Sequence, residues 1–424
     1  MQIVLLEQAL KKLGFVFMIP RERILQSINH KEVNAVPVDL GASTVSGISA
    51  MAYNKLKAKL RLDVPTRVFD VVQQLAQVDE HIMEDFAVDA IDLNSIFMDD
   101  LPWYPVTLAD GSDAFYPDWF RPERDTDESF FTKDEQGRII SRMAKTGACF
   151  DQTYFPWEGG YPEDMDQILE AFRSISWTAH SHNKFINIDE KELRKRAVHL
   201  RKSTDKAIVM SGGVKFLELG FFLRRMDNML MDLLADHQNL TRLLDKLTEL
   251  HLAGLEKKIS ALGDQVDVIR FGDDLGMTTG PFMDLNEFRK LFKPRYRELC
   301  QYVKKNSNMK IFLHSCGSIR QFIPDLIEVG FDILNPVQTN CRGMDARSLK
   351  QEFGSEITFW GGGIDTSSVL PTGSPEEVRA DVLERCEILS KGGGFVFAPI
   401  HNILPEVPPE NIIAAYDAVK EFNS

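Results

Sequence analysis

The segment Lys310-Ile-Phe-Leu-His314-Ser-Cys316-Gly317-Ser318 is a short apolar run followed at once by polar and small residues. The apolar run predicts a buried strand. Because residues i and i+2 of a strand point to the same side, we expect the His314 imidazole and the Cys316 thiol to project together. Such a pair is half of a tetrahedral zinc site. The ordinary alternative is a buried histidine beside a buried cysteine, and the rest of the chain decides between them.

Seven other short apolar runs predict strands, and helical patterns separate most of them. Three of the expected helices cover residues 21–30, 51–60 and 66–85. Eight short strands with intervening helices favour an α/β protein of the closed (β/α)₈ or TIM-barrel class over an open doubly wound sheet. No GxGxxG motif follows the first strand, which argues against dinucleotide binding. The other seven runs begin at Val36, Ala90, Ala207, Val266, Ile333, Ile357 and Phe395.

Residues 96–190 interrupt the alternation with an aromatic-rich insertion after the second strand. Phe130-Phe131 and Ile139-Ile140 flank Gly137 as in a hairpin, which predicts a small antiparallel unit at about 113–148. The aromatic side chains have two interpretations, a local core or the wall of a pocket for a flat substrate. We expect residues 21–424 to form one barrel domain and residues 1–20 an N-terminal helical extension.

The composition is that of an ordinary globular protein. The chain has 424 residues, of which 44% are hydrophobic and 26% charged, with a net charge of −14. The negative charge argues against nucleic-acid binding. Five cysteines without CxxC pairs fit a reducing compartment. We find no secretion signal and no run long enough to span a membrane, so we expect a cytoplasmic protein.

Polar residues gather where predicted strands end, the face on which barrel active sites are built. A single such residue is usually a loop cap, but many at one mouth indicate a ligand. The residues at these positions are Asp39, Asn94, Asp273, Asp274, His314, Cys316, Asn335, Gln338, Asp365 and His401.

His401 follows the eighth strand and is expected to face the same mouth as His314 and Cys316. Three nitrogen or sulfur ligands suggest zinc with an open fourth position. Glu218, Asp274 or Cys341 could complete the set. Each also has an ordinary interpretation, as a helix cap, a turn residue and a bystander.

The chain resembles the uroporphyrinogen decarboxylase superfamily over nearly its whole length. Within it, the chain is more similar to the zinc- and corrinoid-dependent methyltransferases than to the decarboxylases, because Gly41-Ala-Ser-Thr-Val-Ser replaces an arginine-rich segment. The motifs of the resemblance are Arg21-Glu-Arg-Ile-Leu, Val36-Pro-Val-Asp39, Gly272-Asp-Asp-Leu-Gly276, His314-Ser-Cys316-Gly317 and Pro405-Glu-Val-Pro-Pro-Glu410-Asn-Ile.

The resemblance implies zinc held by a His-x-Cys pair and a later cysteine. This chain has His401 where that cysteine is expected, so His401 replaces it or the metal is held differently. The segment from 151 to 156 further resembles members that demethylate methoxylated aromatics. We expect Asp273, Asp274 and Glu218 to be catalytic, and substrate to contact Asp39, Asn94, Tyr154, Asn335 and Gln338.

The resemblance therefore implies a zinc-dependent methyltransferase that moves a methyl group between a small methyl donor and the cobalt of a separate corrinoid protein. Two alternatives are a metal-free decarboxylase of a carboxylated substrate and a barrel without catalytic activity that serves as a binding or assembly subunit.

The sequence also predicts a homodimer. The apolar run Phe221-Phe222-Leu223 and the N-terminal helix offer more apolar surface than a monomer would expose.

Overall fold

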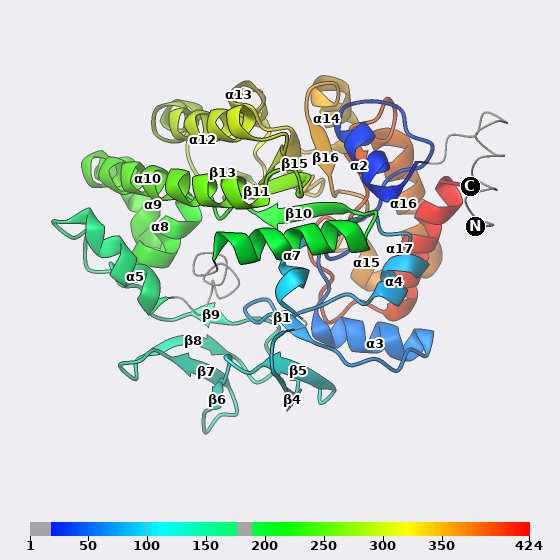
Figure 1. The fold of residues 1–424 in the computed structure, drawn as a ribbon, viewed down its shortest axis with the longest axis horizontal. Coiled ribbons are helices and arrows are strands. Elements are labelled where there is room, and N and C mark those ends of the chain that lie inside the picture. Colours follow the sequence, from blue (N-terminus) through cyan, green and yellow to red (C-terminus); the bar gives the residue numbers. More distant parts are fainter. Residues whose placement is uncertain (1–17, 99, 176–188) are drawn as a thin grey trace.

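The computed structural model describes residues 18–98, 100–175 and 189–424. Its centre is a parallel sheet, of which Figure 1 labels β10, β11, β15 and β16. The strand order is β17-β16-β15-β14-β11-β10-β3, so the neighbouring strands of this sheet also follow one another along the chain. This order confirms the predicted βα alternation. The strands are β3 (Ala90–Asp92), β10 (Ala207–Ser211), β11 (Val268–Gly272), β14 (Lys310–His314), β15 (Ile333–Asn335), β16 (Thr358–Trp360) and β17 (Phe395–Val396).

The segment around Val38 joins the two edges of this sheet. Val38 forms a parallel bridge with Phe397, and the Asp39 N–H donates to the Phe397 carbonyl at 2.8 Å. On the other side, the Asp89 N–H donates to the Val38 carbonyl at 2.7 Å. The first predicted strand is thus a single bridge that closes the sheet into a TIM-barrel-like fold, as the sequence predicted.

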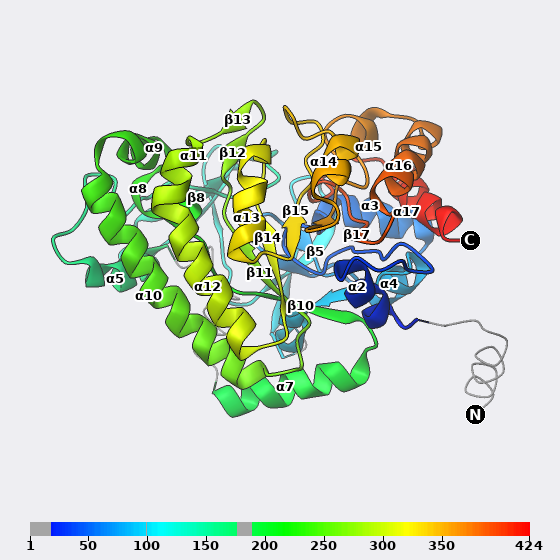
Figure 2. The same cartoon turned by 90° about the horizontal axis from the view of Figure 1, so that it is seen from above.

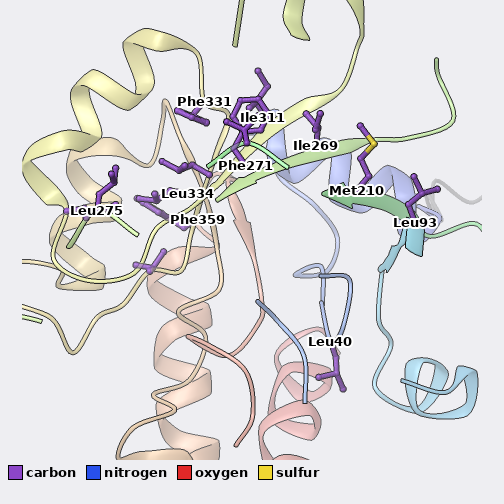
Figure 3. Close-up of a cluster of buried hydrophobic side chains, with 14 of the residues drawn as sticks. Leu40, Leu93, Met210, Ile269, Phe271, Leu275, Ile311, Phe331, Leu334 and Phe359 are labelled. Atoms are coloured by element: carbon purple, nitrogen blue, oxygen red, sulfur yellow. The ribbon is translucent and has the colours of Figure 1, made fainter. Parts of the chain in front are cut away.

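Side chains alternate between the inside and the outside of this barrel. One buried cluster fills the interior and includes Val209, Val268, Phe312 and Trp360. The outward residues of the same strands pack against the helices, and Figure 3 shows part of that layer around Ile269. This alternation fixes which residues reach the mouth, because those that continue the inward rows point into the barrel.

Helices surround the strands (Figures 1 and 2). Helix α2 has a different position, because Ile24 and Ile28 belong to the interior cluster and the Ser27 hydroxyl donates to the Phe395 carbonyl at 2.6 Å. It therefore plugs the barrel at the end where the strands begin. The principal helices are α2 (Pro20–Ile28), α3 (Ala50–Leu60), α7 (Glu190–Ser203), α8 (Leu217–Arg224), α9 (Met226–Ala235), α10 (His237–Leu262), α12 (Lys293–Asn306), α13 (Ile323–Val329), α14 (Ala346–Phe353), α16 (Pro375–Leu389) and α17 (Pro409–Phe422).

The insertion after β3 contains two antiparallel sheets that lie together on one side of the molecule in Figure 1. The hairpin predicted around Gly137 is present as β7 and β8, and Gly137 has a φ of +80°. The aromatic side chains of Tyr116, Phe120 and Phe150 contact one another edge to face, so they form a local core. The strands are β4 (Trp103–Thr107), β5 (Asp113–Pro117), β6 (Glu123–Arg124), β7 (Phe130–Lys133), β8 (Ile139–Met143) and β9 (Asp151–Gln152).

The helix predicted over 66–85 is wrong in its first part. Residues 68–76 form a hairpin of β1 (Val68–Asp70) and β2 (Leu75–Ala76), and only α4 (Glu80–Asp85) is helical. Asp70 accepts from the Val72 and Gln73 N–H groups, and Gln74 takes a φ of +54°. A carboxylate that binds the backbone ahead of it competes with helix formation.

The N-terminal helix, the domain boundaries and the homodimer remain predictions. Most of the expected N-terminal helix lies outside the described residues, and the single-domain assignment stays a prediction. Within the predicted dimer surface, Leu223 is fully buried and Phe221 packs on Phe282, whereas Met231 and Leu234 of α9 are 64% and 84% exposed. The homodimer stays a prediction, and the exposed apolar surface that could form its interface lies on α9 rather than at Phe221-Phe222-Leu223.

Among the described helices, none has the length and apolarity that a membrane crossing requires.

Candidate metal and catalytic site

His314 is the last residue of β14 and continues the inward row of Phe312. It pairs in register with Gly272 of β11 on one side and with Asn335 of β15 on the other. The side chain is only 5% exposed. The imidazole therefore reaches the mouth of the barrel between two neighbouring strand ends.

Asn335 fixes the tautomer of His314. The Asn335 amide N–H donates to the Trp360 carbonyl at 2.8 Å, which leaves its amide oxygen 2.6 Å from His314 Nδ1. Because that oxygen can only accept, Nδ1 carries the proton and Nε2 keeps a free lone pair. Burial, with the neighbouring His401 adding to it, lowers the pKa of His314 to about 3. A neutral imidazole held by its other nitrogen is the usual form of a metal-ligating histidine.

Cys316 lies in a loop that three side chains hold. The Cys316 N–H donates to Asp274 Oδ1 at 2.8 Å, and the Gly317 N–H donates to Gln338 Oε1 at 2.7 Å. The Ser315 hydroxyl accepts from the Leu275 N–H at 3.1 Å. These bonds direct the thiol toward His314, and Cys316 Sγ lies 3.5 Å from His314 Nε2.

His314, Cys316 and His401 come together as the sequence predicted. One ligand atom from each lies within 4.8 Å of the other two. Zinc bonds of about 2.0–2.1 Å to nitrogen and about 2.3 Å to sulfur put tetrahedral N and S ligands about 3.6 Å apart. The His314–Cys316 separation of 3.5 Å matches that edge. Two imidazoles and a thiol are also a donor set that zinc prefers, so these residues fit the metal.

Asp274 is better placed for the fourth position than the other two candidates. Its Oδ1 atom lies 3.6 Å from His314 Nε2, and its side chain is 35% exposed. The cluster of possible ligands in the described chain contains none of the three candidates, but only Asp274 has a carboxylate oxygen this near to a ligand atom of His314. Glu218 instead forms an ion pair with Lys215.

Asp273 has a structural role in this geometry. Its carboxylate is fully buried and accepts from the Phe216, Leu217 and Glu218 N–H groups at 2.8, 3.0 and 2.9 Å. The Tyr296 hydroxyl donates to it at 2.6 Å. Burial, with Glu218 as the next cause, raises the pKa of Asp273 to about 7. These bonds cap the N-terminus of α8, and they leave little of the carboxylate for a substrate.

The residues predicted to bind substrate lie in four different places. Asn335 and Gln338 hold the metal-site residues, as described above. Asp39 is buried and accepts from the Trp360 indole at 2.7 Å and the Ala42 N–H at 2.9 Å, so it supports the loop after the first strand. Tyr154 lies beside β9, where its hydroxyl accepts from Arg138 at 2.9 Å.

Asn94 lines a small cavity at the mouth. Its amide N–H donates to Asp92 at 3.1 Å, but its buried amide oxygen and the Ser95 hydroxyl have no hydrogen-bond partner among the described residues. Gly41 and Met98 line the same cavity. The predicted contact between Asn94 and a ligand stays a prediction, and the unpaired oxygen supports it.

Arg270 was not singled out from the sequence. It lies on β11 within the inward row of Val268, and it is only 8% exposed. A charged residue inside the apolar run Val268-Ile-Arg270-Phe271 was the available indication, because buried barrel strands rarely carry an arginine.

The comparisons with known proteins agree with this fold. Residues 219–422 match the family model for uroporphyrinogen decarboxylase (URO-D). Among curated proteins, the uroporphyrinogen decarboxylases of Pseudoalteromonas translucida and Methylococcus capsulatus are 28% and 26% identical to this chain over 45% and 43% of its length. The matches span about half the length of these relatives, 50% and 48%. The resemblance to the uroporphyrinogen decarboxylase superfamily is confirmed.

A solved structure extends the likeness of fold to the whole chain. A methyltransferase from Methanosarcina mazei superposes with a TM-score of 0.58 over 96% of this chain and 100% of its own, at 18% sequence identity. At this identity the likeness concerns the fold, and function has to be argued from the site.

Proposed function

We propose that this chain is a zinc-dependent methyltransferase that moves a methyl group between a small methyl donor and the cobalt of a corrinoid carried by a separate partner protein. A methoxylated aromatic compound is our candidate donor. The observation that carries the proposal is the convergence of His314, Cys316 and His401 within 4.8 Å at the barrel mouth. A metal-free decarboxylase needs no such set of nitrogen and sulfur ligands to hold a carboxylated substrate.

The chain's own residues prepare this site for metal and substrate. Asn335 keeps His314 in the tautomer whose Nε2 can ligate, and Asp274 holds the backbone of Cys316. His401 is neutral near pH 7, because burial lowers its pKa. Zinc, when bound, supplies a Lewis acid for an ether oxygen or lowers the pKa of a bound thiol. The cobalt chemistry itself belongs to the partner's corrinoid.

A metal-free decarboxylase of a carboxylated substrate is the second candidate. The match of residues 219–422 to the uroporphyrinogen decarboxylase model favours it. This alternative requires no bound metal, so metal content separates the two. The decarboxylase would also act without a corrinoid protein.

The test is methyl transfer in a reconstituted system. The full chain, loaded with zinc, is incubated with a candidate corrinoid protein reduced to cobalt(I) and a panel of methoxyarenes and methylthiols. We expect the visible spectrum of the corrinoid to change from the cobalt(I) form to the methyl-cobalt(III) form, and expect this change to require zinc. Carbon dioxide release from a carboxylated substrate by the metal-free protein would support the decarboxylase instead.

A further inference from the structure

The Arg270 guanidinium is a buried cation that no carboxylate neutralises by contact. Its Nη2 donates to the Thr44 hydroxyl at 3.3 Å, and its buried Nε has no hydrogen-bond partner. Among the described residues, no carboxylate comes within ion-pair distance of it. A buried charge that lacks a partner is costly, so the residue needs an explanation beyond packing.

The three carboxylates that act on Arg270 electrostatically already bind other groups. Asp92 accepts from the Asn94 N–H and amide at 2.8 and 3.1 Å. Asp70 accepts from the Val72 and Gln73 N–H groups at 2.9 and 3.0 Å. Glu218 is paired with Lys215. Each of these carboxylates lowers the cost of the charge at longer range, but none satisfies its donors.

The position of Arg270 brings it beside the metal-site residues. It lies two residues before Gly272, which is in register with His314 on the neighbouring strand. Gly272 has no side chain, and Arg270 Nη1 lies 3.5 Å from the point where a Cβ on Gly272 would be. Lys215 reaches the same point at 3.5 Å. The guanidinium therefore lies beside Gly272, one strand away from His314.

We propose that Arg270, with the Thr44 hydroxyl, binds a carboxylate of the small-molecule substrate and so selects an anionic methyl donor or acceptor. The planar fork of a guanidinium matches a carboxylate in shape and donor spacing. The inference deepens the proposed function and rests on it for the identity of the reacting group. It adds that the substrate carries a carboxylate, and that Arg270, next to the metal-site residues, binds this carboxylate.

Binding by calorimetry tests this without the corrinoid protein. The probes are 3-methoxybenzoate and its neutral analogue 3-methoxybenzyl alcohol, titrated into the full chain. We expect the wild type to prefer the carboxylate by at least about tenfold, the size of one charge-assisted hydrogen bond. Arg270→Met should remove this preference, and Arg270→Lys, which keeps the charge without the fork, should lose part of it.

A matched control separates binding from packing. Arg224 is another buried arginine, but it is paired with Asp232 at 3.0 Å. Arg224→Met should lower the melting temperature and leave the carboxylate preference unchanged. Arg270→Met, which removes an unpaired charge, should melt no lower than the wild type.

The outcomes distinguish this inference from the proposed function. A wild type that binds both probes equally, or an Arg270→Met or Arg270→Lys variant with full carboxylate preference, rejects the carboxylate site. Equal methyl transfer from charged and neutral donors also rejects it while the proposed function stands. Carboxylate preference without any methyl transfer to cobalt keeps the site and rejects the proposed function.

Discussion

The Asn335 amide oxygen lies 2.6 Å from His314 Nδ1, and both side chains are buried. The same amide donates to the Trp360 carbonyl, so its orientation is set by a third strand. This relationship decides which nitrogen of His314 can bind a metal. It also makes the ligand geometry depend on a residue that does not touch the metal.

Replacing Asn335 tests that dependence. Asn335→Leu keeps the volume but removes the acceptor, and we expect it to weaken zinc binding by about tenfold to a hundredfold. Asn335→Asp retains an acceptor for Nδ1 and should bind zinc within a few-fold of the wild type. Competition with a chromophoric chelator measures both. Equal zinc affinity in the leucine variant and the wild type would contradict the role given to Asn335.

Gly317 tests the geometry of the cysteine loop. Its φ is +89°, and a Cβ would lie 2.4 Å from the Gly276 carbonyl carbon and oxygen. Gly317→Ala should therefore destabilise the protein by about 3 kcal/mol or more, because it adds a backbone clash to the strain of positive φ. Gly137 has a similar φ of +80° with nothing within 4 Å, so Gly137→Ala should cost only about 1–2 kcal/mol. Urea unfolding measures both, and equal losses would count against the clash.

Asp273 is expected to matter for stability. Asp273→Asn replaces one of the oxygens that accept from the N-terminus of α8 with an N–H₂ group, which should cost at least about 2 kcal/mol. Asp345 caps α14 by accepting from the Ser348 N–H at 2.8 Å, and Asp345→Asn should be nearly neutral since asparagine caps equally well. Thermal unfolding of the two variants compares the caps. An Asp273→Asn variant of wild-type stability but without activity would support the catalytic role predicted from the sequence.

Lys258 gives the protein a measurable pH dependence. Burial lowers the pKa of Lys258 to about 7, and its ammonium donates to the Gly212 carbonyl at 2.8 Å. The unfolded chain holds this proton up to about pH 10.4, so between pH 7 and 10 it binds more protons than the folded chain. The free energy of unfolding should then rise with pH, by up to about 1.4 kcal/mol per unit, relative to Lys258→Met. Parallel stability curves for the two proteins from pH 6 to 9 would refute this.

The sequence predicted the barrel because apolar strands and inward rows are local patterns. His314 and Cys316 share a side by strand periodicity, and His401 joins them because carboxyl ends of parallel strands meet at one edge. The roles of Asp273 and Asn335 could not be assigned in this way. Asp273 binds backbone 55–57 residues earlier in the chain, and both Asn335 and Asp273 lie at the carboxyl end of a strand. Only their hydrogen-bond partners show that Asp273 caps a helix and that Asn335 orients the metal-site residue His314.

Two other differences have equally specific causes. The hairpin at 68–76 has apolar spacing compatible with a helix, and it forms because Asp70 binds the backbone of its own turn. The proposed role of Arg270 could not be predicted from the sequence, because it depends on the absence of a paired carboxylate in the fold. An unpaired guanidinium is visible only when every neighbouring carboxylate has been accounted for.

Zinc content, measured on the wild type and on Cys316→Ser, tests the central claim most directly. Elemental analysis should find about one zinc per wild-type chain and little in the variant, because serine is a far weaker zinc ligand than a thiolate. The two melting temperatures, compared without metal, should be close, since the core below the mouth holds the fold. A wild type that contains no zinc, takes up none, and still transfers methyl groups would contradict the account.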